Sequence, residues 1–182
     1  MQYRNYGNND QQLSIIAFAG IVVKDETTEA SARYVSWAID QGINYFDVAP
    51  GYGNAQNMLG PALCQYRNDV FLACKTKYRT GSEARTDLEN SLKLLGTDHF
   101  DLYQMHAMTT KEDLEVATGP GGALEVITKA REEGLIKHVG FSVHSAEVAV
   151  ELMSRFEFDS VLFPVNFTTW FEAGFGPQIM NE

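Results

Sequence analysis

The sequence predicts an α/β fold of the (β/α) barrel type, and three observations favour it. Short apolar segments alternate along the chain with longer segments in which apolar residues recur every three or four positions. Several short segments are apolar at nearly every position, which is typical of strands buried on both faces of a parallel sheet. Turn residues separate the segments, and no linker divides the chain. Strands and helices that alternate in this way form βαβ units.

The short apolar segments give the strands. In chain order, the predicted strands are residues 13–18, 43–48, 70–75, 100–106, 136–142 and 160–163. Side chains alternate between the two faces of a strand, so Phe71, Ala73 and Lys75 share one face of the third strand.

The helices follow from apolar residues at helical spacing. They are predicted at residues 29–41, 55–66, 83–95, 122–133 and 146–155. Gly42, Gly96 and Gly134 follow three of them, where glycine readily adopts the left-handed conformation that ends a helix. Ser82 and Ser145 precede two of the helices and are typical N-caps. Residues 107–121 are predicted to be irregular, and such a loop fits a wall of a substrate pocket, a tether or a lid.

Length and composition limit the classes of function. The 182 residues, 45% hydrophobic and 21% charged, predict one globular domain over residues 1–182. The net charge of −10 argues against a nucleic-acid partner, because no basic stripe can neutralise phosphates. Cys64 and Cys74 lack the spacing of metal ligands, so we expect reduced cysteines and no metal. The apolar stretch 13–23 is too short for a signal or a membrane span, which predicts a cytoplasmic protein without membrane association.

Polar side chains stand at the carboxyl ends of the predicted strands. Asp47, Lys75 and His106 are the last or nearly last residues of the second, third and fourth strands. Tyr52 follows in the next loop, where flanking glycines allow a tight turn. Because the chemistry of (β/α) barrels lies at the carboxyl ends of the strands, these residues are candidates for an active site.

These four residue types form a complete set for carbonyl reduction. A tyrosine hydroxyl, with a reference pKa of about 10, donates its proton more easily when an ammonium stabilises the phenolate. The ammonium needs a carboxylate to stay charged in a closed pocket, and a histidine can orient the carbonyl oxygen. Taken singly, Asp47 could instead cap the turn at Pro50, and His106 could be a satisfied core histidine. Lys77 lies on the same face as Lys75 and competes with it for the lysine role.

Several segments resemble signatures of the aldo/keto reductase superfamily. They are residues 46–60 (FDVAPGYGNAQNMLG), 73–75 (ACK), 88–98 (LENSLKLLGTD) with 101–106 (DLYQMH), and 134–142 (GLIKHVGFS). The resemblance implies a (β/α)8 TIM-type barrel that reduces aldehydes or ketones to alcohols. It implies the catalytic tetrad Asp47, Tyr52, Lys75 and His106, with Tyr52 as the general acid.

The resemblance also implies a nicotinamide cofactor and a small carbonyl substrate. The resemblance implies NADPH as the cofactor, with NADH as the alternative, and Asp47, Ser142 and Asn166 as its contacts. Where the family commonly has an asparagine after the serine, this chain has Val143, which cannot supply the hydrogen bonds of an amide side chain. Leu162 stands where the family usually has a glutamine on the sixth strand.

The number of βα units suggests a shortened barrel. The family's barrel has eight units, and about six of them are found in this chain. We therefore expect a chain truncated at its C-terminus, which binds cofactor weakly and associates through the open edges of its first and sixth strands. The alternative function is that of a cofactor-binding regulatory subunit without enzymatic activity, or an inactive fragment of the same family.

Overall fold

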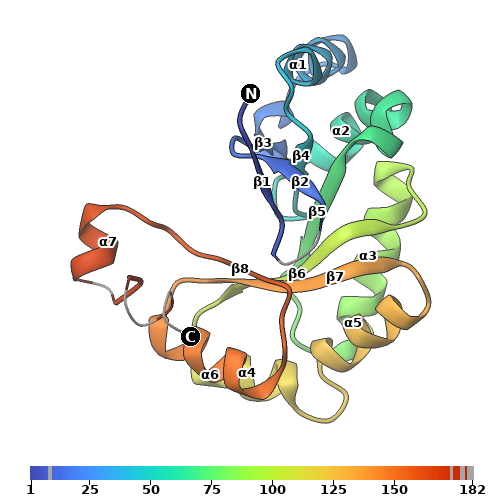
Figure 1. Cartoon of the computed structure of the whole chain (residues 1–182). Coiled ribbons are helices and arrows are strands. Elements are labelled where there is room, and N and C mark those ends of the chain that lie inside the picture. The colour runs from blue at the N-terminus through green and yellow to red at the C-terminus, as the bar shows by residue number, and fades with distance from the viewer. Residues whose placement is uncertain (8–9, 173, 177–178, 180–182) are drawn as a thin grey trace.

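A curled parallel sheet forms the centre of the molecule (Figure 1). The structure, a computed structural model, describes residues 1–7, 10–172, 174–176 and 179. Six strands pair in the order β3-β4-β5-β6-β7-β8, each beside its neighbours along the chain. They are β3 (Phe18–Ala19), β4 (Tyr45–Asp47), β5 (Phe71–Thr76), β6 (Phe100–Met108), β7 (Ile136–Val143) and β8 (Ser160–Leu162). The sheet has the curvature of an incomplete barrel, which confirms the predicted fold class.

Helices connect the strands and cover the convex side of the sheet (Figure 1). The five predicted helices are present as α1 (Thr28–Asp40), α2 (Ala55–Leu63), α3 (Gly81–Leu95), α5 (Ala123–Glu132) and α6 (Ala146–Arg155). The α-helical part of α2 is shorter than predicted, because the chain continues as a 3-10 helix, η2 (Cys64–Asp69). The N-cap of α3 is Thr80 and not the predicted Ser82, since the Gly81 amide donates to Gly121 O at 2.7 Å and fixes the start of the helix.

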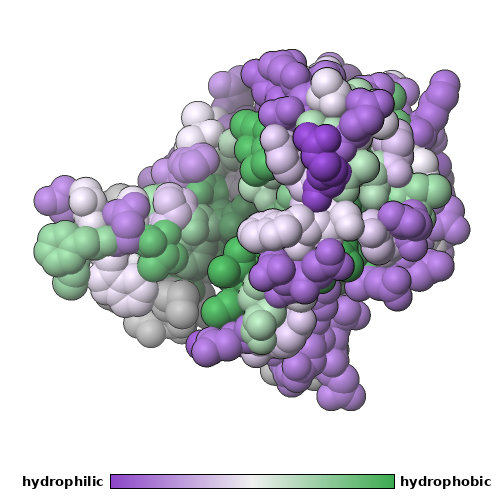
Figure 2. All heavy atoms as spheres, turned by 90° about the horizontal axis from the view of Figure 1, so that it is seen from above, coloured by the Kyte–Doolittle hydropathy of each residue, from purple (hydrophilic) through white to green (hydrophobic). Residues whose placement is uncertain are grey.

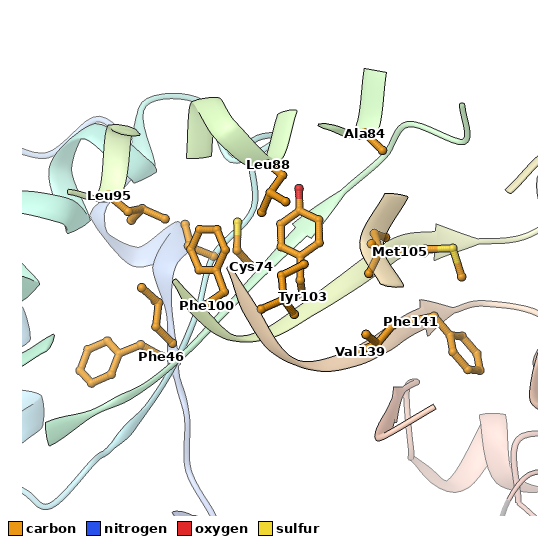
Figure 3. Packing of buried hydrophobic residues seen from close by; sticks show 14 of the residues in the cluster. Phe46, Cys74, Ala84, Leu88, Leu95, Phe100, Tyr103, Met105, Val139 and Phe141 are labelled. Atoms are coloured by element: carbon orange, nitrogen blue, oxygen red, sulfur yellow. The ribbon is translucent and has the colours of Figure 1, made fainter. Parts of the chain in front are cut away.

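Two apolar clusters lie on opposite faces of the sheet. The main core fills the space between sheet and helices, and Figure 3 shows Phe46, Cys74, Leu88 and Tyr103 in it. A smaller cluster on the other face joins the side chains of Leu13, Phe71, Ala73 and Leu102. Because both faces are covered, β5 is buried at every position. Lys75 shares the face of Phe71 and Ala73, which is the inner face of the incomplete barrel.

The predicted first strand, residues 13–18, is wrong as one continuous strand. Its beginning belongs instead to an antiparallel pair of β1 (Tyr3–Asn5) and β2 (Gln12–Ser14), and the parallel sheet begins at β3. Ser14 ends β2, because its amide donates to Asn44 Oδ1 at 2.8 Å and its hydroxyl donates to Ile16 O at 2.8 Å. The pair leads into Tyr6, whose ring centroid lies 5.1 Å from that of Phe71 and covers the inner face.

The predicted irregular loop, residues 107–121, is also corrected. β6 continues to Met108, and α4 (Lys111–Thr118) follows. Thr110 and Asp113 form a capping box, in which each side chain accepts from the other residue's backbone amide. A Thr-x-x-Asp pattern was therefore the signal for a helix that the sequence analysis missed.

The C-terminal segment carries apolar side chains that are exposed. After β8 a short helix, α7 (Phe167–Phe171), stands apart from the body of the molecule, and apolar atoms border the hollow between them (Figure 2). Phe167 is 83% exposed and Phe171 71%. Within the described residues, β3 and β8 each pair with one strand only, so both edges of the sheet are open.

Candidate active site

A buried ion pair joins the ends of β4 and β5. The parallel register sets Asp47 beside Ala73, and Lys75 follows two positions later on the same face. The Lys75 ammonium donates to Asp47 Oδ1, although Lys75 is only 1% exposed. Burial raises the pKa of the Asp47 carboxyl, and the Lys75 ammonium acts against that shift. A lysine this deeply buried is tolerated as a cation only because a carboxylate pairs with it.

Tyr52 lies next to this ion pair. Its loop is a tight turn in which the Tyr52 amide donates to Ala49 O at 3.0 Å, and Gly53 has a positive φ of +61°. The turn brings the Tyr52 ring to 5.7 Å from Lys75 Nζ, measured to the ring centroid. The phenol is thus close enough to the ammonium to be influenced by its charge.

His106 joins Asp47, Lys75 and Tyr52 from β6, the strand next to β5. Its ring meets the Tyr52 ring edge-on, with 6.1 Å between centroids and an interplanar angle of 89°. Burial lowers the pKa of His106 to about 4, and the nearby Lys75, Lys77, Arg79 and His144 side chains add to this shift. The imidazole is therefore neutral at pH 7. Its Nδ1 atom is buried and has no hydrogen-bond partner among the described residues, so His106 is not a satisfied core histidine.

One cavity touches all four residues. Its volume is about 320 Å³, and it is lined by Asp47, Tyr52, Lys75, His106, Ser142, Val143, His144, Leu162, Phe163 and Pro164. A larger hollow of about 600 Å³, beside α5, is lined by Thr118–Pro120 and polar helix residues and has no comparable set. The residues predicted from strand ends thus converge on a single cavity that is polar on one side and apolar on the other.

The structure separates Lys75 from Lys77. Lys77 is exposed, and its Nζ lies 3.6 Å from the position that a Cβ on Gly51 would occupy. Lys77 therefore lies along the outside of the Tyr52 loop, whereas Lys75 is buried against Asp47. The geometry favours Lys75 for the role beside Tyr52.

The two other predicted cofactor contacts differ in position. Ser142, on β7, lines the cavity, and its Oγ accepts from the Ala107 amide at 2.7 Å. The hydroxyl proton of Ser142 is left to donate to another group. Asn166 is not among the lining residues; its Oδ1 caps α7 by accepting from the Thr169 amide at 3.0 Å. The contact of Asn166 with a cofactor stays a prediction.

Sequence reasoning missed Arg79. This residue lies in the loop between β5 and α3, and its Nη2 donates to His106 O at 2.9 Å and to Ala107 O at 3.0 Å. Its partners lie 27 to 34 positions away in the sequence, so no local spacing reveals them. His144, Phe163 and Pro164 are further lining residues that had not been proposed as site residues.

The described ranges lack two further features. No group of three or more histidine, cysteine or acidic side chains there is arranged to hold a metal ion. No described helix combines the length and the apolar character that crossing a bilayer requires.

Known proteins are similar to this chain in sequence. The profile of the aldo/keto reductase family matches residues 20–174. The aldo-keto reductase YhdN of Bacillus subtilis is 35% identical over 137 residues, which cover 68% of this chain and 39% of YhdN. The uncharacterized oxidoreductase YqkF of the same organism is 27% identical over 176 residues, which cover 89% of this chain and 55% of YqkF. The chain thus spans about half, or less, of the length of these relatives.

Solved structures give the same picture of the fold. The holo form of the aldo-keto reductase AKR11C1 from Bacillus halodurans superposes with a TM-score of 0.79 at 24% identity, covering 91% of this chain and 58% of that one. A putative aldo-keto reductase from Pseudomonas aeruginosa gives a TM-score of 0.82 at 23% identity, covering 92% of this chain and 69% of its own. The six strands of the parallel sheet therefore correspond to part of a (β/α)8 barrel, and the chain belongs to the aldo/keto reductase family of oxidoreductases.

Proposed function

We propose that the site reduces an aldehyde or ketone to an alcohol with a nicotinamide cofactor, NADPH in preference to NADH. One observation carries the proposal: a buried Lys75–Asp47 ion pair lies beside Tyr52 and His106 around one cavity. Each member of that group comes from a different strand end or loop, so the folded chain assembles it. The preference for NADPH rests on the family resemblance.

The lining residues fit such a cofactor and substrate. Ser142 has a hydroxyl proton to donate, and Asp47 Oδ2 and His106 Nδ1 are buried without partners among the described residues. Unpartnered buried polar atoms in a cavity favour a polar ligand, because leaving them unpaired has a free-energy cost. The apolar wall of Leu162, Phe163 and Pro164 suits a flat ring or a small apolar substrate group.

The roles of the protein groups follow from their positions. When bound, the nicotinamide supplies the hydride that adds to the carbonyl carbon. The Tyr52 hydroxyl donates its proton to the carbonyl oxygen, which completes the alcohol and leaves a phenolate. The Lys75 ammonium stabilises that phenolate, and Asp47 keeps the ammonium charged and in place. Neutral His106 donates a hydrogen bond to the carbonyl oxygen and orients it toward Tyr52.

A substrate screen tests the proposal. The protein is mixed with NADPH, or with NADH, and a panel of aldehydes and ketones, while the absorbance of the reduced nicotinamide is followed. We expect consumption of the cofactor with at least one carbonyl compound and none without protein. Cofactor binding without turnover across the panel would instead support the non-enzymatic regulatory subunit.

A further inference from the structure

The backbone beside His106 has an unusual conformation. Ala107 has a φ of +53°, in the left-handed region that residues with a Cβ rarely adopt. The pairing of β6 with β7 also shifts here, since Met105 pairs with Phe141 and Met108 with Val143. β6 thus uses one more residue than β7 over this stretch, which is a β-bulge. Regular alternation from Leu102 places His106 on the inner face of β6. The bulge follows directly after it, so the bulge fixes the backbone that carries the His106 imidazole.

Hydrogen bonds from three directions hold the bulge. Ser142 Oγ accepts from the Ala107 amide at 2.7 Å. The Thr109 hydroxyl donates to Ala107 O at 2.8 Å. Arg79 Nη2 donates to both carbonyls that flank the distorted position, His106 O at 2.9 Å and Ala107 O at 3.0 Å. Arg79 is the only one of the three that contacts the backbone of His106 itself.

Arg79 is in turn fixed at both of its ends. Its Nε donates to Asp113 Oδ1 at 2.8 Å, and Asp113 belongs to the capping box of α4. Its backbone carbonyl accepts from the Ala123 amide at 2.8 Å, at the start of α5. Only 15% of the Arg79 side chain is exposed. The guanidinium therefore links the start of α4 to the backbone of His106, while the main chain of Arg79 is held at the start of α5.

We propose that Arg79, held by Asp113, is a positioning residue that fixes the bulge at Ala107 and thereby holds the His106 imidazole in place at the cavity. The importance of that orientation for reduction rests on the proposed function, but the positioning itself does not. The planar fork of arginine can serve two carbonyls and a carboxylate at once, and a lysine ammonium cannot reproduce that geometry. Without the hydrogen bonds of the guanidinium, the backbone around His106 relaxes and the His106 ring becomes more hydrated.

The hydration of His106 provides the test, because burial is the main cause of its low pKa. The charged and titratable groups around the imidazole are Lys75, Lys77, Arg79, His144 and Tyr52, so a change of charge must be separated from a change of position. Arg79→Lys keeps the charge and loses the fork. Asp113→Asn keeps Arg79 and removes its anchor. Arg85→Lys, an arginine of α3 that pairs with Glu89 and Glu133 outside the site, is the matched control.

The measurement is an NMR titration of the imidazole signals in each variant, with His106 assigned by its loss in His106→Gln. We expect a pKa near 4 in the wild type and in Arg85→Lys, and a rise toward 6.5 in Arg79→Lys and Asp113→Asn. An unchanged His106 pKa in both Arg79→Lys and Asp113→Asn, in folded protein, overturns the proposal. Thermal unfolding of the same samples identifies any variant that has lost its fold, and the other variant then decides.

The titration does not require turnover. Its result therefore tests the role of Arg79 even if the protein reduces none of the carbonyl compounds. Where a reducible substrate is found, Arg79→Lys should lower kcat by roughly 10- to 100-fold with little change in the KM of the cofactor. A loss of cofactor affinity with unchanged kcat would show that Arg79 shapes cofactor binding and does not position His106.

Discussion

The Lys75 ammonium donates to the Asp47 carboxylate across two neighbouring parallel strands, at a depth where Lys75 is almost fully buried. Every other part of the candidate site is arranged around this contact. Tyr52 reaches the ammonium from the loop after β4, and His106 meets the Tyr52 ring from β6. A buried ion pair contributes little to stability compared with a well-packed apolar pair. Its presence therefore favours a role in chemistry. The dependence of the two charges on each other can be tested by measuring the stability of variants.

Breaking the ion pair from one side should destabilise the fold more than removing both charges. Asp47→Asn leaves the Lys75 ammonium buried without a carboxylate, and we expect a loss of about 3 kcal/mol in the free energy of unfolding. The double variant Asp47→Asn/Lys75→Met should recover a large part of that loss. Urea unfolding of the wild type, both single variants and the double variant measures the coupling. Purely additive losses would show that the two charges do not depend on each other.

The low pKa of His106 should make the fold less stable in mild acid. Its pKa is about 4 in the folded state and 6.5 in the reference state, so the unfolded chain binds more protons between these values. The contribution of the neutral His106 to the free energy of unfolding is therefore complete above pH 6.5 and is lost as the pH falls toward 4. Because the ring is only partly buried and solvent screens its charge, we expect a contribution of roughly 1–2 kcal/mol to the free energy of unfolding. Urea unfolding at several pH values measures it, and His106→Gln should remove this part of the dependence. An identical pH dependence in His106→Gln would contradict the account.

Substitutions at Ala107 should report the backbone conformation of the bulge. Ala107→Gly should leave stability nearly unchanged or slightly raised, since glycine adopts a φ of +53° without strain. Ala107→Val should cost about 1–3 kcal/mol, because a branched side chain is disfavoured in this region. Thermal unfolding of the two variants makes the comparison. Equal stability of Gly and Val at this position would mean that the left-handed conformation is absent in solution.

The sequence predicted the parts of the site that depend on strand periodicity. Asp47, Lys75 and His106 lie at the ends of apolar segments, and parallel strands bring such ends together, so their meeting could be expected before the structure was known. The predicted positions of five helices also agree with the structure, because each carries a full apolar face.

Other features depend on contacts that no local pattern encodes. The hairpin of β1 and β2 follows from hydrogen bonds between Ser14 and Asn44, 30 positions apart. The hydrogen bonds of Arg79 join partners from three separate segments: β6, the start of α4 and the start of α5. The helix α4 is different: its capping box was present in the sequence, but its eight residues are too few to give a clear apolar periodicity.

The open edges of the sheet should cause self-association of this chain. Among the described residues β8 pairs only with β7, and Leu162 on it is 45% exposed. Unpaired strand edges with apolar side chains template pairing with other chains. Sedimentation velocity should show dimers or larger species, reduced in Leu162→Lys but not in the control Leu94→Lys on α3. A monodisperse monomer in the wild type would contradict the prediction.

Turnover of Tyr52→Phe tests the central claim most directly. This change removes one hydroxyl and keeps the ring that packs beside Lys75 and His106. Loss of a general acid lowers rates by roughly 10²- to 10⁴-fold, and we expect such a loss of carbonyl reduction, with NADPH affinity nearly unchanged in a fluorescence titration. Reduction by Tyr52→Phe at a rate close to that of the wild type, in the same preparation and with the same substrate, would contradict the assignment of Tyr52 as the proton donor.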